Sequence, residues 1–179
     1  MAASRTLPTE HPKSSSQYKA PEPNAAPFAL TRPHTIGLNS LSRHVFIVLV
    51  DDNPADILLV REALVWHEVK SELLIARDGD EAINLLGEID SQLLPCPDLV
   101  VLDLNLPRKT GFDVLEFMRS SPRCGKIPVA ILSSSDAPSD QHRAELLGAS
   151  RYFQKPSNLQ DFLSIGAKLK EMLLPLAGH

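Results

Sequence analysis

The chain has 179 residues, a length typical of one domain with or without an extension. Its 43% hydrophobic content can form a core, and its 18 basic and 22 acidic residues give a net charge of −4. This charge argues against nucleic-acid binding, which needs a basic face. We find no apolar run that could span a membrane or act as a secretory signal. Two cysteines, Cys96 and Cys124, are too few for a disulfide scaffold, so we expect reduced thiols and a cytoplasmic protein without membrane contact.

Residues 1–44 differ in composition from the rest of the chain. They contain six of the fifteen prolines and a run of three serines, and they show no periodic apolar pattern. Such a segment cannot bury enough apolar surface to offset the entropy of ordering it. We therefore predict a disordered tail over 1–44, a folded domain over 45–174 and a short C-terminal end at 175–179. We interpret the tail as a dispensable extension, with a partner-binding arm as the alternative.

Five short apolar runs in the predicted domain have the composition of β-strands. The first, Val45–Val50, is rich in β-branched residues and too short for a buried helix. Continuous apolar runs of this kind are typical of parallel strands that are buried on both faces. The five predicted strands are 45–50, 73–76, 99–102, 129–132 and 152–153.

Segments with helical spacing follow each of these runs. The first helix is predicted to begin at Asn53 and Pro54, because proline suits the first helical position. The second begins at the acidic stretch 78–81, where carboxylates interact favourably with the helix dipole. The remaining helices are predicted around 114–118, 146–147 and 162–172. Five strands that alternate with five helices predict a doubly wound α/β fold, (βα)5, with a parallel sheet covered by helices on both faces.

Polar residues stand at the carboxyl ends of four of the predicted strands. Asp51 and Asp52 follow the first strand, Asp103 the third, Ser133 the fourth and Lys155 the fifth. In open parallel sheets, ligands bind beyond the carboxyl ends of the strands. We therefore expect three carboxylates, a hydroxyl and an ammonium to converge on one edge of the sheet.

This combination of groups is suited to phosphoryl transfer. Three neighbouring carboxylates favour a hard cation such as Mg²⁺, which takes oxygen ligands and commonly binds phosphate as well. A carboxylate can also act as a nucleophile and form an aspartyl-phosphate. Lysine and serine can contact phosphoryl oxygens, so the set supplies the positioning and the charge neutralisation that the reaction needs.

Five sequence motifs cover this edge and the strands that lead to it. They are Val-Asp-Asp-Asn-Pro-Ala-Asp at 50–56, Leu-Asp-Leu-Asn-Leu-Pro at 102–107, Ile-Leu-Ser-Ser-Ser at 131–135, Gly-Ala-Ser at 148–150 and Tyr-Phe-Gln-Lys-Pro at 152–156. Together they resemble the CheY-like receiver domain of two-component response regulators. The first two motifs resemble those of small stand-alone receivers associated with phytochrome-type histidine kinases.

The resemblance implies a flavodoxin-like strand order, 2-1-3-4-5, and a role for each candidate residue. Asp103 would be the phosphoacceptor. Mg²⁺ would be held by Asp51, Asp52, Asp103 and the main-chain carbonyl of Asn105.

The remaining implied roles concern the response to phosphorylation. Ser133 and Lys155 would contact the phosphoryl group, and Lys155 would pair with Asp103 in the resting state. Tyr152 would be an aromatic switch that reorients with Ser133. The resemblance also implies a cis peptide bond between Lys155 and Pro156.

On this basis we expect a response regulator that accepts a phosphoryl group from a histidine kinase, rather than an enzyme. Its output would be protein–protein contact, including a homodimer formed by the fourth helix, the fifth strand and the fifth helix. One alternative is a degenerate receiver that acts as a phosphorylation-independent adaptor. The other is a phosphatase of the haloacid-dehalogenase type. The latter carries its nucleophile in an Asp-x-Asp motif at the first strand, whereas the candidate nucleophile here follows the third.

Overall fold

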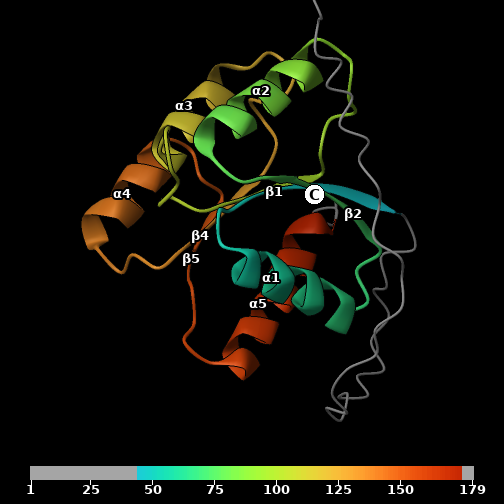
Figure 1. Ribbon diagram of the computed structural model, residues 1–179, viewed down its shortest axis with the longest axis vertical. Helices are drawn as coiled ribbons and strands as arrows, with labels where there is room; N and C mark the ends of the chain where they lie inside the picture. Colours follow the sequence, from blue (N-terminus) through green and yellow to red (C-terminus); the bar gives the residue numbers. More distant parts are fainter. Residues whose placement is uncertain (1–43, 175–179) are drawn as a thin grey trace, which may run out of the picture. The chain divides into compact units, whose positions relative to one another are not determined.

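The computed structural model describes residues 44–174 (Figure 1). The short C-terminal end and, apart from His44, the predicted disordered tail lie outside these residues. The strands are β1 (Val45–Val50), β2 (Ser71–Ala76), β3 (Leu99–Leu102), β4 (Val129–Ser133) and β5 (Arg151–Gln154). The helices are α1 (Pro54–Trp66), α2 (Gly79–Asp90), α3 (Gly111–Ser120), α4 (Pro138–Leu146) and α5 (Leu159–Leu173). Within this described part, no helix has the length and apolarity needed to cross a membrane.

The five strands form one parallel sheet in the order β2-β1-β3-β4-β5, which confirms the predicted fold. Val50, the last residue of β1, pairs with Ala76 of β2 and with Leu102 of β3. The carboxyl ends of the two central strands are therefore adjacent. Any residue that follows β1 directly is placed beside the residue that follows β3.

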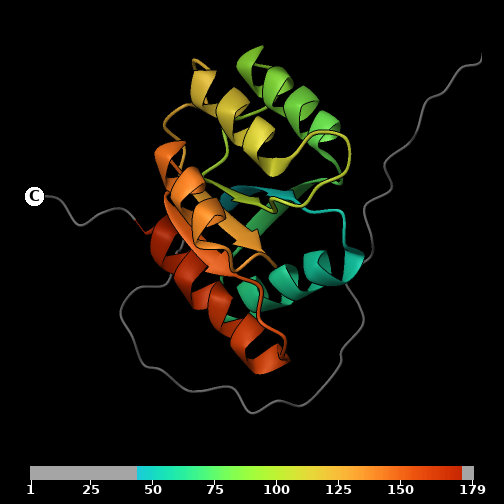
Figure 2. The same cartoon turned by 90° about the vertical axis from the view of Figure 1, so that its left-hand side faces the viewer.

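Helices cover both faces of the sheet (Figures 1 and 2). Successive residues of a strand point to opposite faces. Ile47 and Leu49 of β1 accordingly belong to a core cluster with Leu64 of α1 and Phe162 of α5. Val48, between them, belongs to the cluster formed with α2, α3 and α4. A shift of one residue in β1 would exchange these two sets, so the cores fix the register and with it the position of the residues after β1.

The helix-start signals of the sequence correspond to real caps. The Asn53 side chain accepts a hydrogen bond from the N–H of Ala55 at 3.0 Å, and Pro54 occupies the first position of α1. Asp78 accepts from the N–H of Glu81 in the same way at the start of α2. Gly148 follows α4 with a φ of 85°, a conformation that glycine adopts without strain.

Several elements are longer than predicted, β2, β5 and α4 among them. β2 and β5 lie at the edges of the sheet, where polar residues such as Glu72 and Arg151 extend the strands with exposed side chains. Helix α4 begins at Pro138, well before the apolar residues that marked it. Its only buried residue is Ala144, so it carries no apolar stripe that marks its start. A local signal was Pro138, which occupies the first helical position as Pro54 does in α1.

Candidate functional site

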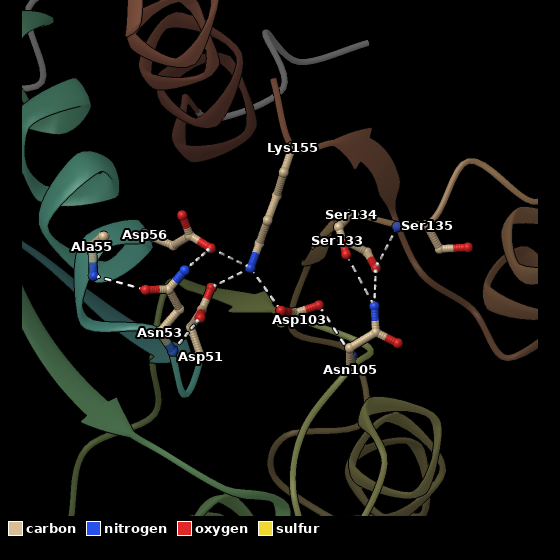
Figure 3. Close-up of polar contacts among 10 residues, drawn as sticks. All are labelled: Asp51, Asn53, Ala55, Asp56, Asp103, Asn105, Ser133, Ser134, Ser135 and Lys155. Atoms are coloured by element: carbon tan, nitrogen blue, oxygen red, sulfur yellow. Dashed lines mark hydrogen bonds and ion pairs between the residues drawn. The ribbon is translucent and has the colours of Figure 1, made fainter. Parts of the chain in front are cut away.

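The carboxyl edge of the sheet brings the predicted polar residues together (Figure 3). Asp51 follows β1, Asp103 follows β3, Ser133 ends β4 and Lys155 follows β5. Asp51, Asp103 and Ser133 are buried, whereas Asp52 is exposed. The expected convergence of carboxylates, hydroxyl and ammonium is therefore present at one edge.

The ammonium of Lys155 lies at the centre of the site. Its Nζ is 2.6 Å from Oδ2 of Asp103, 2.8 Å from Oδ2 of Asp51 and 2.9 Å from Oδ2 of Asp56. A lysine ammonium has three N–H donors, so each can serve one of these carboxylates. The pairing of Lys155 with Asp103 has the geometry expected for the resting state.

Burial and hydrogen bonding shift two pKa values at the site. Burial by itself would lower the pKa of Lys155, but the hydrogen bonds to Asp103, Asp51 and Asp56 outweigh it and raise that pKa above its ordinary range. Burial raises the pKa of the Asp51 carboxyl. This effect exceeds the opposite effect of the hydrogen bonds that Asp51 accepts from Lys155 and from the N–H of Asn53. One ammonium thus faces a surplus of carboxylates, which favours the binding of a further cation.

Three carboxylates form a candidate metal site. Asp51, Asp52 and Asp103 each place one carboxylate oxygen within 4.8 Å of the others. This all-oxygen donor set fits a hard divalent cation such as Mg²⁺. Asn105 lies beside it, because its N–H donates to Oδ1 of Asp103 at 3.1 Å. The main-chain carbonyl of Asn105 as a further ligand remains a prediction.

The Ser133 hydroxyl lies on the β4 side of the site. Nδ2 of Asn105 lies 3.5 Å from Oγ of Ser133 and 3.2 Å from Oγ of Ser134 (Figure 3). The N–H of Ser135 also donates to Oγ of Ser133, at 3.3 Å. Asn105 therefore links the loop after β3, which carries Asp103, to Ser133 at the end of β4 and to Ser134 just beyond it.

The phenol of Tyr152 faces the same β4–α4 loop. Its hydroxyl donates a hydrogen bond to the main-chain carbonyl of Ser135 at 3.0 Å. Burial raises the pKa of this phenol, more than hydrogen bonds with Ser133 and Ser135 lower it. Tyr152 is thus placed next to the segment that contains Ser133. Its reorientation with Ser133, as an aromatic switch, remains a prediction.

The peptide bond between Lys155 and Pro156 is trans, since the described residues contain no cis peptide bond. The predicted cis bond is therefore wrong. An X-Pro bond favours trans by about 0.5–1 kcal/mol, and the cis expectation came from the resemblance alone. With the trans bond, the N–H of Lys155 donates to the carbonyl of Ser133 at 2.8 Å while its Nζ reaches all three carboxylates.

The sequence analysis missed Asp56 as a member of the site. Asp56 lies in the first turn of α1, three residues after the capping Asn53, and Nδ2 of Asn53 donates to its Oδ2 at 3.0 Å. The sequence did carry a signal for this role. Helix α1 begins just beyond the carboxyl end of β1, so an acid three residues after Asn53 lies close to the site. An acid in the first turn of a helix is usually explained by its favourable interaction with the helix dipole. That common explanation concealed the contact of Asp56 with Lys155.

Comparisons with known proteins agree with the geometry. Residues 47–165 match the response regulator receiver domain. Response regulator Rcp1 of Synechocystis sp. is 38% identical over 122 residues, which cover 66% of this chain and 82% of Rcp1. Two-component response regulator ARR17 of Arabidopsis thaliana is 31% identical over 130 residues, which cover 69% of this chain and 84% of ARR17.

Solved structures show the same relationship. The phosphorylated cyanobacterial phytochrome response regulator RcpA has a TM-score of 0.68 at 38% identity, covering 76% of this chain and 98% of RcpA. The Mn²⁺-bound form of Rcp1 has a TM-score of 0.67 at 33% identity, covering 75% of this chain and 97% of Rcp1. The match and the position of Asp103 after β3 rule out the haloacid-dehalogenase alternative. The chain belongs to the family of response regulator receiver domains, the signalling proteins of two-component phosphorelays.

Proposed function

We propose that Asp103 accepts a phosphoryl group from the phosphohistidine of a histidine kinase. The observation that carries this proposal is the environment of its carboxylate, which adjoins both the Asp51–Asp52 pair and the Lys155 ammonium. Such surroundings can neutralise the charge that gathers when a phosphoryl group meets a carboxylate. Ser133 adds a hydroxyl that can donate to a phosphoryl oxygen.

The proposed transfer forms one bond and breaks one. An oxygen of Asp103 attacks the phosphorus, the P–N bond to the kinase imidazole breaks, and the released imidazole nitrogen takes up a proton. Mg²⁺, held by Asp51, Asp52, Asp103 and the Asn105 carbonyl, supplies positive charge for the phosphoryl oxygens when bound. Lys155 and Ser133 orient the acyl phosphate, which water later hydrolyses to regenerate Asp103 and release inorganic phosphate.

The wider assignment follows from the same chemistry. We propose a signalling protein with no enzymatic activity beyond its own phosphotransfer and dephosphorylation, and a cytoplasmic location where a kinase can reach it. RcpA is described as a phytochrome response regulator. This likeness supports a phytochrome-type histidine kinase as the phosphoryl donor.

Acetyl phosphate with Mg²⁺ tests the phosphoacceptor. Intact mass spectrometry should detect one added phosphoryl group on the wild type and none on Asp103→Asn, because the amide is not a nucleophile of comparable strength. Asp136→Asn, a change at an exposed acid in the β4–α4 loop, should be labelled like the wild type. Equal labelling of Asp103→Asn would refute the assignment, and an unlabelled wild type would favour the phosphorylation-independent adaptor.

We further propose that the output surface comprises α4, β5 and α5, and that two copies associate through it. Two features support this surface: β5 is an edge strand, and Leu146 of α4 has 74% of its surface exposed. Sedimentation with Mg²⁺ and beryllofluoride, a mimic of the phosphoryl group, should show a dimer that Leu146→Glu weakens. Leu93→Glu changes an equally exposed leucine after α2 and should leave the dimer intact. A monomer under all conditions would contradict this proposal.

A further inference from the structure

Asp56 differs from the other two carboxylates that contact Lys155. Asp51 and Asp103 belong to the candidate metal cluster, whereas Asp56 does not. Its side chain is 18% exposed and its Oδ2 lies 2.9 Å from Nζ of Lys155 (Figure 3). Asp56 therefore offers Lys155 a partner that a bound cation would not use.

Asn53 holds the Asp56 carboxylate in place. Its side chain spans the first turn of α1: Oδ1 accepts from the N–H of Ala55 at 3.0 Å, and Nδ2 donates to Oδ2 of Asp56 at 3.0 Å. The same Asp56 oxygen thus receives hydrogen bonds from Asn53 and from Lys155. The carboxylate is tied to the helix start and does not depend on the metal cluster for its position.

Lys155 and a divalent cation would share the remaining carboxylates. Oδ1 of Asp51 accepts from the N–H of Asn53, and Oδ1 of Asp103 accepts from the N–H of Asn105, while both Oδ2 atoms accept from Lys155. A cation bound by these groups therefore meets carboxylates that already have partners. Two neighbouring positive charges repel each other, so cation binding weakens the hold of Asp51 and Asp103 on the ammonium.

We propose that Asp56 is a positioning residue that keeps the Lys155 ammonium beside Asp103 when Mg²⁺ occupies the cluster. The ammonium then remains in place for the phosphoryl group on Asp103. This inference rests on the proposed function and adds to it a residue that acts only through Lys155. Without the Asp56 charge, Lys155 would have to be held by the same two carboxylates that bind the cation.

Binding of beryllofluoride tests this role without a covalent step. A Mg²⁺ titration by calorimetry first sets the saturating concentration for each variant, and beryllofluoride is then titrated at that concentration. Asp56→Asn keeps the size of the side chain and removes its charge. We expect it to bind beryllofluoride about tenfold more weakly than the wild type, because a charged partner of Lys155 is lost.

The chain contains a matched control at the start of α5. Nδ2 of Asn158 donates to Oδ2 of Asp161 at 2.8 Å, and its Oδ1 accepts from the N–H of Asp161. This pair has the same spacing as Asn53 and Asp56. Asp161→Asn removes a charge from an equivalent first turn and should leave beryllofluoride affinity unchanged. A loss as large as that of Asp56→Asn would overturn the proposal, because it would reflect the helix start and not Lys155.

A double-mutant cycle separates positioning from a purely structural effect. In a Lys155→Ala background, Asp56→Asn should cause no further loss of affinity, because its target is absent. The same loss in both backgrounds would overturn the role, and so would wild-type affinity in Asp56→Asn itself. Thermal unfolding checks each variant, and Asp56→Ser serves as a second substitution if Asp56→Asn does not fold. Beryllofluoride binding that is equal in wild type and Asp103→Asn would instead refute the proposed phosphoacceptor.

Discussion

At the scale of single residues, the site depends on the balance between one ammonium and several carboxylates. Lys155 has only 10% of its side chain exposed, and its three partners are also largely removed from water. Buried carboxylates without a positive partner are costly, because burial removes the water that would stabilise their charge. In the absence of metal, Lys155 is the group that offsets this cost.

Lys155→Met should therefore destabilise the metal-free protein. We expect the free energy of unfolding to fall by about 2–4 kcal/mol, because methionine fills similar space but leaves the carboxylates without a cation. Saturating Mg²⁺ should restore most of this loss. Urea unfolding with and without Mg²⁺ measures both effects, and Lys126→Met, at an exposed lysine, provides the control. An equal loss with and without Mg²⁺ would show that the charge balance is not the cause.

At the scale of elements, helix α3 packs tightly against the backbone that carries Asp103. A Cβ atom on Gly111 would lie 2.2 Å from the carbonyl oxygen of Asp103 and 2.7 Å from Cα of Leu104. The N–H of Gly111 also donates to the carbonyl of Leu104 at 3.0 Å. The first residue of α3 thus helps to fix the position of the predicted phosphoacceptor, and only glycine allows so close an approach.

Gly111→Ala should lower the free energy of unfolding by about 1–3 kcal/mol, because the added methyl group must displace backbone atoms. Gly87 provides the contrasting change, since a Cβ there would meet no atom within 4 Å. Gly87→Ala, inside α2, should raise the free energy of unfolding by about 0.5–1 kcal/mol. Urea unfolding compares the two variants. A gain in stability from Gly111→Ala would show that the contact with Asp103 is not tight.

At the scale of the molecule, the candidate metal cluster would link cation binding to folding, because it joins residues that are far apart in the sequence. Asp51 and Asp52 follow β1, and Asp103 follows β3. An unfolded chain cannot hold these carboxylates together, so a bound cation stabilises the folded state alone. At a concentration of one hundred times the dissociation constant, this stabilisation is about 2.7 kcal/mol.

Mg²⁺ should therefore raise the thermal unfolding temperature of the wild type in a concentration-dependent way. Asp52→Asn should reduce this shift while leaving the metal-free unfolding temperature almost unchanged, because Asp52 is exposed. Calorimetric scans over a range of Mg²⁺ concentrations measure both quantities. Asp136→Asn, which removes an exposed acid outside the cluster, should show the full shift. An undiminished shift in Asp52→Asn would remove Asp52 from the metal site.

The sequence by itself determined the fold and the residues at the ends of its strands. Short apolar runs such as Val45–Val50 favour strands because of their own composition, and in a parallel sheet the residues after such runs must lie at one edge. The convergence of Asp51, Asp103, Ser133 and Lys155 could therefore be predicted from their positions along the chain alone.

Only the tertiary structure decided how these groups pair. Asp56 and Lys155 are 99 residues apart, and their contact depends on how α1 and the segment after β5 lie across the sheet edge. The trans bond at Lys155 was decided in the same way, by backbone geometry that leaves no local pattern. Strand formation depends mainly on local composition, whereas the partners of a buried charge depend on packing between distant segments, and that packing exists only in the folded chain.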